Sequence, residues 1–374
     1  MEANELKFWI AFNRVPRIGR ARFMVLESYF GTMDRAWHAS GSDLKDAGID
    51  SKTAQLVVTS RATIDPDAEL ERLAKSDINA FTWHDASYPS RLKEIYDLPP
   101  VIYVRGTLSP EDERSVAVVG TRNASVYGRE VAHRLTYDLA RSGVTIVSGL
   151  ARGIDGIAHR AALDARQRTV AVLGSGIDVI YPREHSKLAS EITENGALIS
   201  EHPLGTRPNA QNFPRRNRIM SGMTLGTVII EAPEGSGALF TAKHALDENR
   251  EVFAVPGNIT SPNSRGTNRL IKESGAKLVL DYKDILEELN LSSVGHQIEM
   301  TALFPEDDNE SQVLRYVTYD PVHIDEVIRE SGLNIPAVSS ALAIMELKGL
   351  IKQVGGMNYI RLKETSTEYE AVVR

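Results

Sequence analysis

The sequence contains no cysteine among its 374 residues. This absence excludes disulfide bonds, thiolate nucleophiles and cysteine-ligated zinc sites, and nothing in the composition marks an oxidising compartment. Long apolar runs are missing as well. The first residues, MEANELKFWIAFNRV, do not form a basic start followed by an uninterrupted apolar run, and no stretch of about 20 apolar residues occurs. We therefore expect a cytoplasmic protein without membrane contact.

Several motifs of nucleotide-binding and hydrolytic proteins are also absent. The loop after the first strand predicted for the central domain reads GTRNAS in place of G-x-G-x-x-G, and no P-loop motif or Gly-Lys dipeptide occurs. G-x-S-x-G and H-E-x-x-H are missing too. Asp155 and His159 stand four residues apart on a predicted helix and could orient a general base, but such a pair is more often structural. We expect no cofactor, no metal site and no enzymatic activity.

What the sequence does contain is a regular alternation of strands and helices. Short, nearly all-apolar runs alternate with helix-length amphipathic segments at 115–119, 144–147, 169–173, 197–200, 227–230 and 251–255, with a further run at 276–280. This alternation predicts a buried, doubly wound parallel sheet of the Rossmann-like type, with helices on both faces. Such sheets bind ligands at the carboxyl ends of their strands. The loops at that edge are therefore the candidate site.

The length predicts two or three domains, and 42% hydrophobic residues provide enough apolar material for their cores. We expect an α/β protein in which flanking modules surround the sheet. The expected order is a helical domain (1–65), a connector (66–106), an extended Rossmann-like domain (107–290) that contains the candidate site, a linker (291–310), a winged helix (311–363) and a tail (364–374).

The two flanking modules leave their partners open. The N-terminal module contains two helix-turn-Gly-helix units that resemble helix-hairpin-helix or SAM-like folds, and its first hairpin is basic through Arg14, Arg17, Arg20 and Arg22. The C-terminal module has two predicted helices, the first from Val322, and a hairpin that turns at Gly355–Gly356, an order that resembles a winged helix. The only charged residue of its second helix is Glu346, which speaks against a strong DNA reader. Either module could contact DNA or a protein.

Four glycine-rich loops follow the predicted strands, at 120–125, 148–155, 174–178 and 234–238. Glycine lets the backbone approach an anion closely, and a helix that begins after such a loop points free N–H groups at it. The loops thus predict a row of phosphate-sized sites, although each could also be a plain tight turn. The candidate DNA-contacting residues in these loops are Arg122, Ser148, Gly149, Arg152, Gly174, Ser175, Gly176, Gly235, Ser236 and Gly237.

The most unusual stretch runs from His202 to Ile230, because it contains no Asp or Glu in a chain of net charge −7. It carries four arginines, Arg207, Arg215, Arg216 and Arg218. Guanidinium groups match phosphate oxygens, and Phe213 adds a ring on which a base could stack. An arginine cluster next to an aromatic residue is typical of a groove for single-stranded nucleic acid. The alternative is a solvated loop whose arginines pair with carboxylates elsewhere.

Four sequence blocks resemble the signature blocks of the DNA-processing protein A family, also called the Smf family. They are VSGLARGID (147–155), LGSGID (173–178) with IYP (180–182), FPRRNRI (213–219) and GSGA (235–238), and the resemblance covers about residues 85–290. It implies a cytosolic, non-enzymatic protein of natural transformation that is dimeric through its Rossmann-like domain. Such a protein coats incoming single-stranded DNA, loads the recombinase RecA on it and shields it from nucleases.

The resemblance also implies roles for individual residues. Arg122 corresponds to the family's phosphate-contacting arginine, and Arg183 occupies a second basic position. Phe213 is expected to stack on a base. The arginines 215, 216 and 218 are expected to divide between phosphates and internal pairing, with Arg218 as the internal one, because its segment would begin a helix packed on the sheet.

A different class of function stays open. Glu231, followed by the GSG run at 235–237, is similar to the site of lysine-decarboxylase-like nucleotide hydrolases, in which an acid after this strand assists release of a base. The sequence lacks their P-G-G-x-G-T run and has Pro233-Glu-Gly-Ser-Gly-Ala instead. A third interpretation is a structural adaptor whose loops bind nothing.

Overall fold

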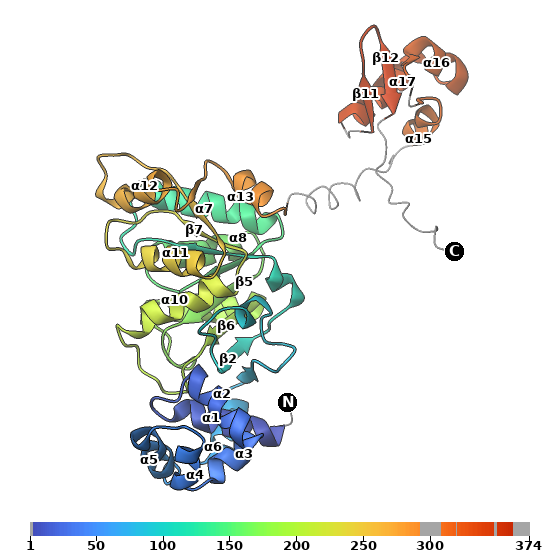
Figure 1. The fold of residues 1–374 in the computed structure, drawn as a ribbon. Coiled ribbons are helices and arrows are strands. Elements are labelled where there is room, and N and C mark those ends of the chain that lie inside the picture. Colours follow the sequence, from blue (N-terminus) through green and yellow to red (C-terminus); the bar gives the residue numbers. More distant parts are fainter. Residues whose placement is uncertain (1–2, 292–307, 319, 348–349, 362–374) are drawn as a thin grey trace. The chain divides into compact units, whose positions relative to one another are not determined.

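The computed structural model describes residues 3–291, 308–318, 320–347 and 350–361 (Figure 1). They belong to two compact units, which divide between Ser292 and Ser293. The first unit comprises the N-terminal helices and a nine-stranded sheet, and the second comprises a three-stranded sheet with its own helices. Within the described ranges, no helix combines the length and the apolar character that crossing a bilayer requires.

The N-terminal module consists of short helices, α1 (Ala3–Arg14), α2 (Arg20–Phe30), α3 (Met33–His38), α4 (Gly41–Asp46) and α5 (Ser51–Ser60). Side-chain caps begin three of them, because Thr32, Ser40 and Asp50 each accept a hydrogen bond from the backbone N–H three residues further on. Stacked rings fill the core between α1 and α2, where Trp9 and Phe23 have centroids 5.2 Å apart. Caps and aromatic packing together hold helices that are too short to be stable alone.

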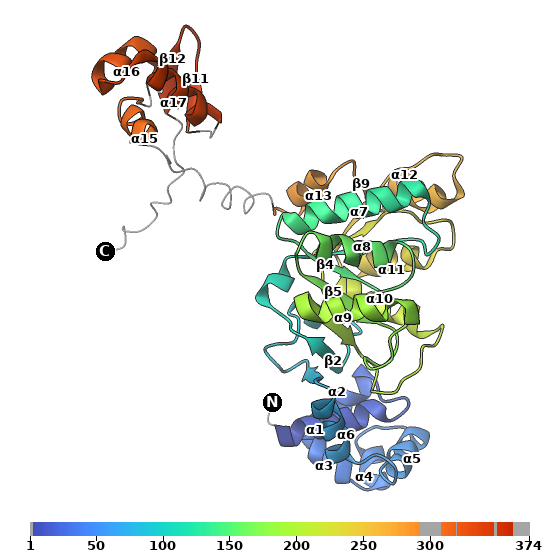
Figure 2. The same cartoon turned by 180° about the vertical axis from the view of Figure 1, so that it is seen from behind.

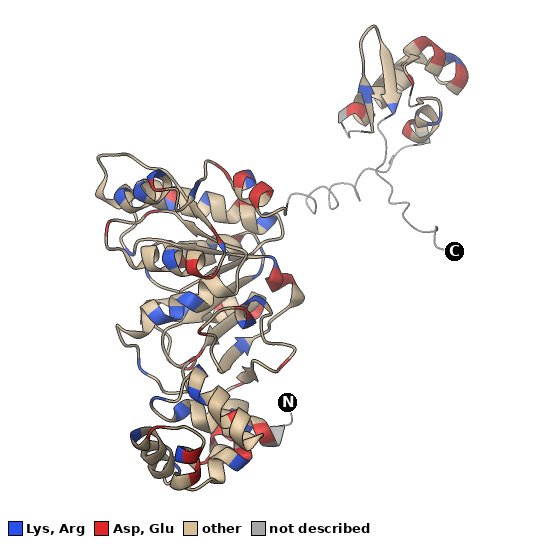
Figure 3. Cartoon of the chain, in the orientation of Figure 1, with Lys and Arg blue, Asp and Glu red and all other residues tan. Residues whose placement is uncertain are grey.

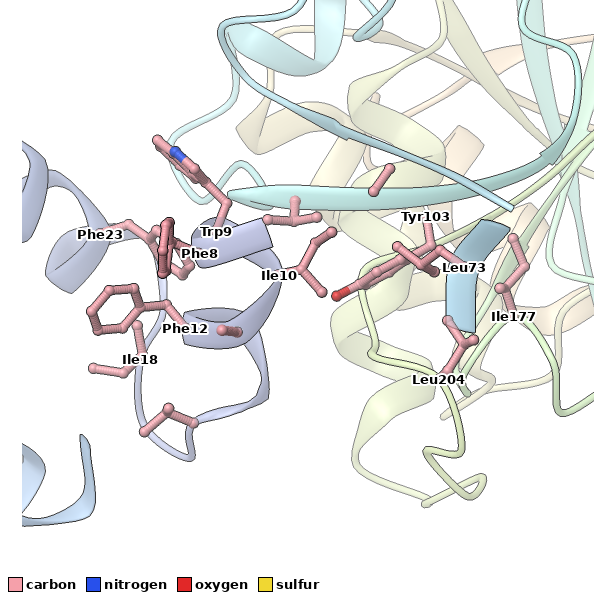
Figure 4. Packing of buried hydrophobic residues seen from close by; sticks show 14 of the residues in the cluster. Phe8, Trp9, Ile10, Phe12, Ile18, Phe23, Leu73, Tyr103, Ile177 and Leu204 are labelled. Carbon is pink, nitrogen blue, oxygen red and sulfur yellow. The ribbon is translucent and has the colours of Figure 1, made fainter. Parts of the chain in front are cut away.

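The module shares one hydrophobic core with the edge of the sheet. Figure 4 shows Trp9 and Phe12 on the helical side of this core and Tyr103 on the sheet side. The contact is also polar, since Asn13 Nδ2 donates to Tyr103 Oη at 3.2 Å and to the carbonyl of Glu201 at 3.1 Å. The N-terminal helices are therefore packed onto the sheet.

The sheet has the strand order β1-β2-β6-β5-β4-β3-β7-β8-β9. The strands from β6 to β9 in this order are parallel, while β1 and β2 are antiparallel to their neighbours. Their bounds are β1 (Asn79–Thr82), β2 (Val101–Gly106), β3 (Ser115–Val119), β4 (Thr145–Ser148), β5 (Thr169–Leu173), β6 (Gly196–Ser200), β7 (Gly226–Ile229), β8 (Glu251–Ala254) and β9 (Lys277–Leu278). The predicted Rossmann-like parallel sheet is confirmed.

Helices cover both faces of the sheet (Figures 1 and 2). One face packs against α7 (Val126–Arg141), α8 (Ile154–Asp164) and α13 (Tyr282–Glu288), and the other against α10 (Asn212–Gly222) and α11 (Gly237–Asp247). Because strand side chains alternate, Ile146 joins the α7 and α8 core and Val147 joins the α10 and α11 core. The remaining helices of the unit are α9 (Ser186–Asn195), α12 (Arg265–Lys272), η1 (Arg91–Lys93), η2 (Pro110–Glu113), η3 (Arg183–His185) and η4 (Pro262–Ser264).

Residues 66–106, which were expected to be a connector, are instead part of the folded unit. They form helix α6 (Pro66–Lys75) and the strands β1 and β2, which extend the sheet through antiparallel pairing of β2 with β6. Val101, Ile102 and Tyr103 are buried. The prolines at 99 and 100 give this segment the look of a linker, but they end just before the strand begins.

The second unit has the winged-helix order that was predicted. Its elements are α15 (Asp308–Leu314), β10 (Val322–His323), α16 (Ile324–Ser331), α17 (Ile335–Leu347), β11 (Ile351–Gln353) and β12 (Asn358–Arg361), with the sheet order β10-β12-β11. Two boundaries differ from expectation: α15 begins inside the expected linker 291–310, and Val322 starts a strand rather than a helix, because it pairs with Tyr359. Linker residues 292–307 and the expected tail 364–374 lie outside the described residues.

Candidate nucleic-acid interface

The loops at the carboxyl ends of the strands surround a cavity of about 650 Å³. The chain runs from β3 through β4 and β5 to one side of the sheet and places β7 and β8 on the other side of β3. Strand order therefore reverses between β3 and β7, which is where such sheets bind ligands. The cavity lies at this point, and its lining includes Gly120, Arg122, Ala151, Asp155, Tyr181, Phe213, Arg216, Asn217, Ser236, Gly237 and Thr241.

Arg122 and Phe213 meet at this cavity although they are far apart in the sequence. The Arg122 guanidinium lies over the Phe213 ring, 5.6 Å from its centroid. The Tyr181 ring also contacts Phe213, with centroids 5.5 Å apart. Arg122 is exposed and forms no ion pair with any carboxylate in the described part of the chain. The first loop, the loop after β5 and the start of α10 thus combine a free cation with two aromatic rings.

Two glycines of the predicted loops are required by close packing of the protein's own side chains. A Cβ at Gly149 would lie 2.3 Å from Nη2 of Arg216, and a Cβ at Gly174 would lie 2.9 Å from Cδ1 of Phe213. The sequence predicts that glycine here admits a phosphate. The structure shows instead that Gly149 admits a buried guanidinium and Gly174 admits an aromatic ring.

Arg216 is a predicted DNA contact that the structure places inside the protein. Only 3% of its surface is exposed, and its Nη1 donates to the carbonyl of Gly149 at 2.7 Å and to the carbonyl of Val172. Burial lowers the pKa of Arg216 to about 10, while the nearby Asp155 carboxylate opposes this shift. Arg216 is internal because it lies one helical turn before Ile219 and Met220, on the face of α10 that packs against the sheet. It forms the floor of the cavity.

The other two arginines of α10 differ in their partners, because Arg218 is paired with carboxylates and Arg215 is not. Arg218 pairs with Glu201 at 2.7 Å and with Asp97 at 3.0 Å, so that it is internal, as expected. Arg215 is exposed, and no carboxylate of the described residues pairs with its side chain. Of the three arginines of this helix, only Arg215 can therefore offer its guanidinium to a ligand without breaking an internal contact.

Several other residues predicted to contact DNA already have a partner within the protein. Arg152 pairs with Glu184 at 2.5 Å across the protein surface. The Ser148 hydroxyl donates to the carbonyl of Val118 at 2.6 Å, and the Ser175 hydroxyl donates to that of Val179 at 2.7 Å. Buried strand-end hydroxyls of this kind satisfy backbone carbonyls before any ligand arrives.

The glycine amides are only partly available. The Gly176 N–H donates to the carbonyl of Thr206 at 2.9 Å, and in the second loop the Ala151 N–H donates to the Asp155 carboxylate at 3.4 Å. Gly235 has a left-handed φ of 78°, and Ser236 caps α11 by accepting from the N–H of Ala238 at 3.3 Å. Of the four loops predicted to bind phosphates, the first loop and the loop that leads into α11 are therefore the ones we keep as candidates.

Arg183 and Arg207 are two further exposed cations, each close in sequence to a residue that lines the cavity. Arg183 begins η3, two residues after Tyr181, and Arg207 precedes Pro208, which lines the cavity. Both are exposed, and neither pairs with a carboxylate where the structure is described. Tyr181 lines the cavity but was not among the predicted site residues. The available signal was its place in the IYP block at 180–182, two residues before Arg183.

The acidic groups near the cavity are committed to the fold. Glu231 is 2% exposed, and its carboxylate accepts from the Ser125 N–H at 2.9 Å and the Ser125 hydroxyl at 2.6 Å, at the start of α7. His159 is buried against Thr169 Oγ1 at 2.7 Å, and burial lowers its pKa to about 3. Asp155 lines the cavity at 6% exposure, but His159, the partner expected to act with it, is fully buried, and Glu231 is 2% exposed; neither His159 nor Glu231 is placed as an accessible general base. Among the residues described, no cluster of His, Asp and Glu could hold a metal ion.

Comparison with known proteins decides the family. The family model for DNA recombination-mediator protein A matches residues 79–290, and the model for the DprA winged helix domain matches residues 299–357. The chain belongs to the DNA recombination-mediator protein A family. The first match begins at Asn79, the first residue of β1, and therefore includes the two strands of the expected connector.

Relatives of this family match between 57% and 96% of the chain. Protein Smf of Synechocystis is 32% identical over 398 residues, which cover 96% of this chain and all of that protein. Protein Smf of Escherichia coli is 42% identical, covering 74% of this chain and 75% of that protein. DNA processing protein DprA of Bacillus subtilis is 44% identical, covering 57% and 71% respectively.

Solved structures of this family share the fold. DprA of Streptococcus pneumoniae superposes with a TM-score of 0.67 at 34% identity, covering 75% of this chain and 97% of that chain. DNA processing protein A of Helicobacter pylori gives a TM-score of 0.51 at 28% identity, covering 56% and 95%. The structure of the Helicobacter protein was described for its single-stranded DNA binding mode.

Proposed function

We propose that this member of the DNA recombination-mediator protein A family binds single-stranded DNA at the strand-end cavity and acts in DNA processing during natural transformation. The observation that carries the proposal is the Arg122 guanidinium, held over Phe213 at the rim of the cavity and unpaired with any described carboxylate. A free guanidinium binds phosphate, and aromatic rings next to it bind unstacked bases. The Helicobacter relative, named for its single-stranded DNA binding mode, supports the same ligand.

The phosphate contacts that we propose are fewer than the sequence predicted. Arg122, Arg183, Arg207 and Arg215 are exposed and lack carboxylate partners among the described residues, and the start of α11 at Gly237 adds backbone N–H groups at the cavity. Arg216 and Arg218 act from inside, by fixing the helix that carries Phe213 and Arg215. Binding should therefore depend on a small number of exposed cations.

We further propose that the bound strand is protected from nucleases and handed to RecA in the cytoplasm. The family description, a recombination mediator, supports such a transfer. We also propose that the chain forms a homodimer through the Rossmann-like domain. Support comes from the open edge of the sheet at β9, where Leu278 is 45% exposed and Leu280 is 80% exposed.

The nucleotide-hydrolase alternative has less support from the site. It requires an acid after β7 that reaches a bound nucleotide, but the Glu231 carboxylate is buried and holds the N-terminus of α7. Incubation of the protein with nucleoside monophosphates and an assay for free base would reveal such an activity, and we expect none.

The test of the binding proposal is a salt titration with fluorescent oligonucleotides. We expect tighter binding of single strands than of duplexes and an affinity that falls steeply with added salt. In Arg122→Ala, the affinity should fall, and the slope of log affinity against log salt should shrink by about 0.7, the value for one lost phosphate contact. Light scattering on the same samples reports whether the bound species is a dimer.

Arg134→Ala is the matched control, because Arg134 is an exposed arginine of α7 that pairs with no described carboxylate. α7 covers the face of the sheet opposite to α10. This variant should bind like the parent chain. Equal binding by Arg122→Ala and the parent at every salt concentration would contradict the assignment of the site.

A further inference from the structure

Tyr181 is an exposed aromatic residue at the centre of the proposed interface. It follows β5 and precedes η3, and 43% of its surface is exposed. It lines the cavity of about 650 Å³ and also a smaller adjoining cavity of about 40 Å³. Tyr181 therefore borders both cavities, together with Arg122 and Phe213.

The Phe213 ring is less exposed than that of Tyr181 and has three close neighbours in the protein. The Arg122 guanidinium lies over the ring, 5.6 Å from its centroid, and the backbone of Gly174 is so close that a Cβ there would come within 2.9 Å of the ring. The third neighbour is the Tyr181 ring itself, tilted by 39° with centroids 5.5 Å apart. Tyr181 therefore offers a base more exposed ring surface than Phe213 does.

We propose that Tyr181 supplies the ring on which a DNA base stacks, and that Phe213 supports Tyr181 from behind and holds Arg122 in position for a phosphate. This assignment rests on the proposed function of the site. Arg183, two residues after Tyr181 and free of carboxylate partners in the described part of the chain, places a second phosphate contact beside the stacked base. Base stacking and phosphate binding then come from one continuous segment.

The ring of Tyr181, and not its hydroxyl, carries the proposed contact. Among the described residues, no hydrogen bond involves the Tyr181 hydroxyl. Stacking on an aromatic face tolerates every base, because each base has a π-face. The contact should therefore add affinity without sequence preference, and Tyr181→Phe should preserve it.

The experiment compares two oligonucleotides of equal length and charge, one of thymidines and one of abasic tetrahydrofuran units. Tyr181→Ala should weaken binding of the thymidine strand by about 5- to 150-fold, the range expected for one lost base–aromatic stack. Its affinity for the abasic strand should equal that of the parent, because the phosphate contacts are intact. Phe213→Leu should weaken the binding of both strands, since it removes the support of Arg122.

Tyr29→Ala is the matched control. Tyr29 is an exposed tyrosine on α2 that contacts Phe30 with ring centroids 4.9 Å apart, so that it is a second surface tyrosine beside a phenylalanine, outside the cavity. It should bind both strands like the parent. Circular dichroism melting of each variant reports whether the fold is retained, and Tyr181→Phe repeats the test with the ring preserved.

The outcomes separate the two levels of the argument. If Tyr181→Ala bound thymidine strands like the parent, or lost equal affinity for both strands, the stacking role would be wrong while the binding function stood. If the parent chain bound neither oligonucleotide, the proposed function itself would fail. Loss of affinity in Tyr181→Phe equal to that in Tyr181→Ala would also overturn the assignment to the ring.

Discussion

The N-terminal hairpin and the strand-end interface are similarly rich in arginine, but they differ in what those arginines contact. In the hairpin, Arg14 pairs with Glu69 at 2.9 Å, and Arg17 and Arg22 both pair with Asp50, at 3.8 and 2.9 Å. Figure 3 shows acidic and basic residues interleaved over these helices. The charge that the sequence concentrates in the hairpin is largely neutralised by the fold.

At the strand ends, the exposed arginines keep their charge available. No carboxylate of the described residues pairs with Arg122, Arg183 or Arg215, and helix α10 contains no acidic residue. The comparison teaches that a count of arginines does not predict an anion site. What matters is whether acids from other segments reach them, and those acids can be distant in the sequence, as Glu69 is from Arg14.

The largest effect on stability is expected at Arg216. This arginine is buried, so it belongs neither to the paired arginines of the hairpin nor to the exposed ones at the strand ends. We expect Arg216→Met to lower the free energy of unfolding by about 2–6 kcal/mol, because two buried carbonyls lose their charged donor at about 1–3 kcal/mol each and the nearby buried Asp155 loses a counter-charge. Here, Asp155 and the carbonyls of Gly149 and Val172 would remain. Urea denaturation followed by circular dichroism measures the change.

The control for this prediction is Arg215→Ala, one residue earlier on α10. Because Arg215 is exposed and unpaired with any described carboxylate, its removal should change the unfolding free energy by no more than about 0.5 kcal/mol while weakening DNA binding. Similar destabilisation by both variants would mean that the two side chains are not divided between inside and outside as the structure shows.

These contrasts also show how much of the molecule could be predicted from sequence. The apolar runs predicted the parallel sheet because a strand buried on both faces leaves a continuous pattern. Strands β1 and β2 were missed because Pro99 and Pro100 precede β2 and mask it. The burial of Arg216 was not predicted, because a charged residue does not count as part of an apolar helical face, although Arg216 lies on the same face of α10 as Ile219 and Met220.

The sequence predicted where the candidate site lies better than it predicted which side chains are free to contact a ligand there. The arginine stretch and the loops do meet at one cavity, since the carboxyl ends of parallel strands share one edge. Which groups stay free is decided by pairs such as Arg152 with Glu184 and Arg218 with Glu201. Such pairs depend on packing between distant segments, and a local pattern contains no record of them.

A smaller effect is expected at Glu248, an acid beside arginines that already have partners. Arg218 pairs with Glu201 and Asp97, and Arg250 pairs with Glu94. Burial raises the pKa of Glu248 from 4.5 to about 7, although a hydrogen bond with Ser221 and these arginines oppose the shift.

The sign of the resulting pH dependence follows from the direction of the shift. Because the pKa in the folded state lies above that in the unfolded state, the contribution of Glu248 to stability is fully present below about pH 4.5 and is lost as the pH rises through about 7. Glu248→Gln should therefore gain on the order of 1–3 kcal/mol of stability relative to the parent at pH 8 and little at pH 4.5. Thermal melting at both values measures the difference, and an equal gain at both would contradict it.

The smallest effect is expected at Arg17, one of the paired arginines of the N-terminal hairpin. Arg17→Ala removes an arginine whose guanidinium lies 3.8 Å from Asp50, at a surface where ion pairs contribute little. Both its single-stranded DNA affinity and the salt dependence of that affinity should match those of the parent, because a cation that is already paired releases few counterions from DNA. The measurement is the salt titration used for Arg122→Ala. A smaller salt slope in Arg17→Ala would show that Arg17 leaves Asp50 to bind a DNA phosphate. In that case, a nearby carboxylate would not by itself prevent an arginine from contacting DNA.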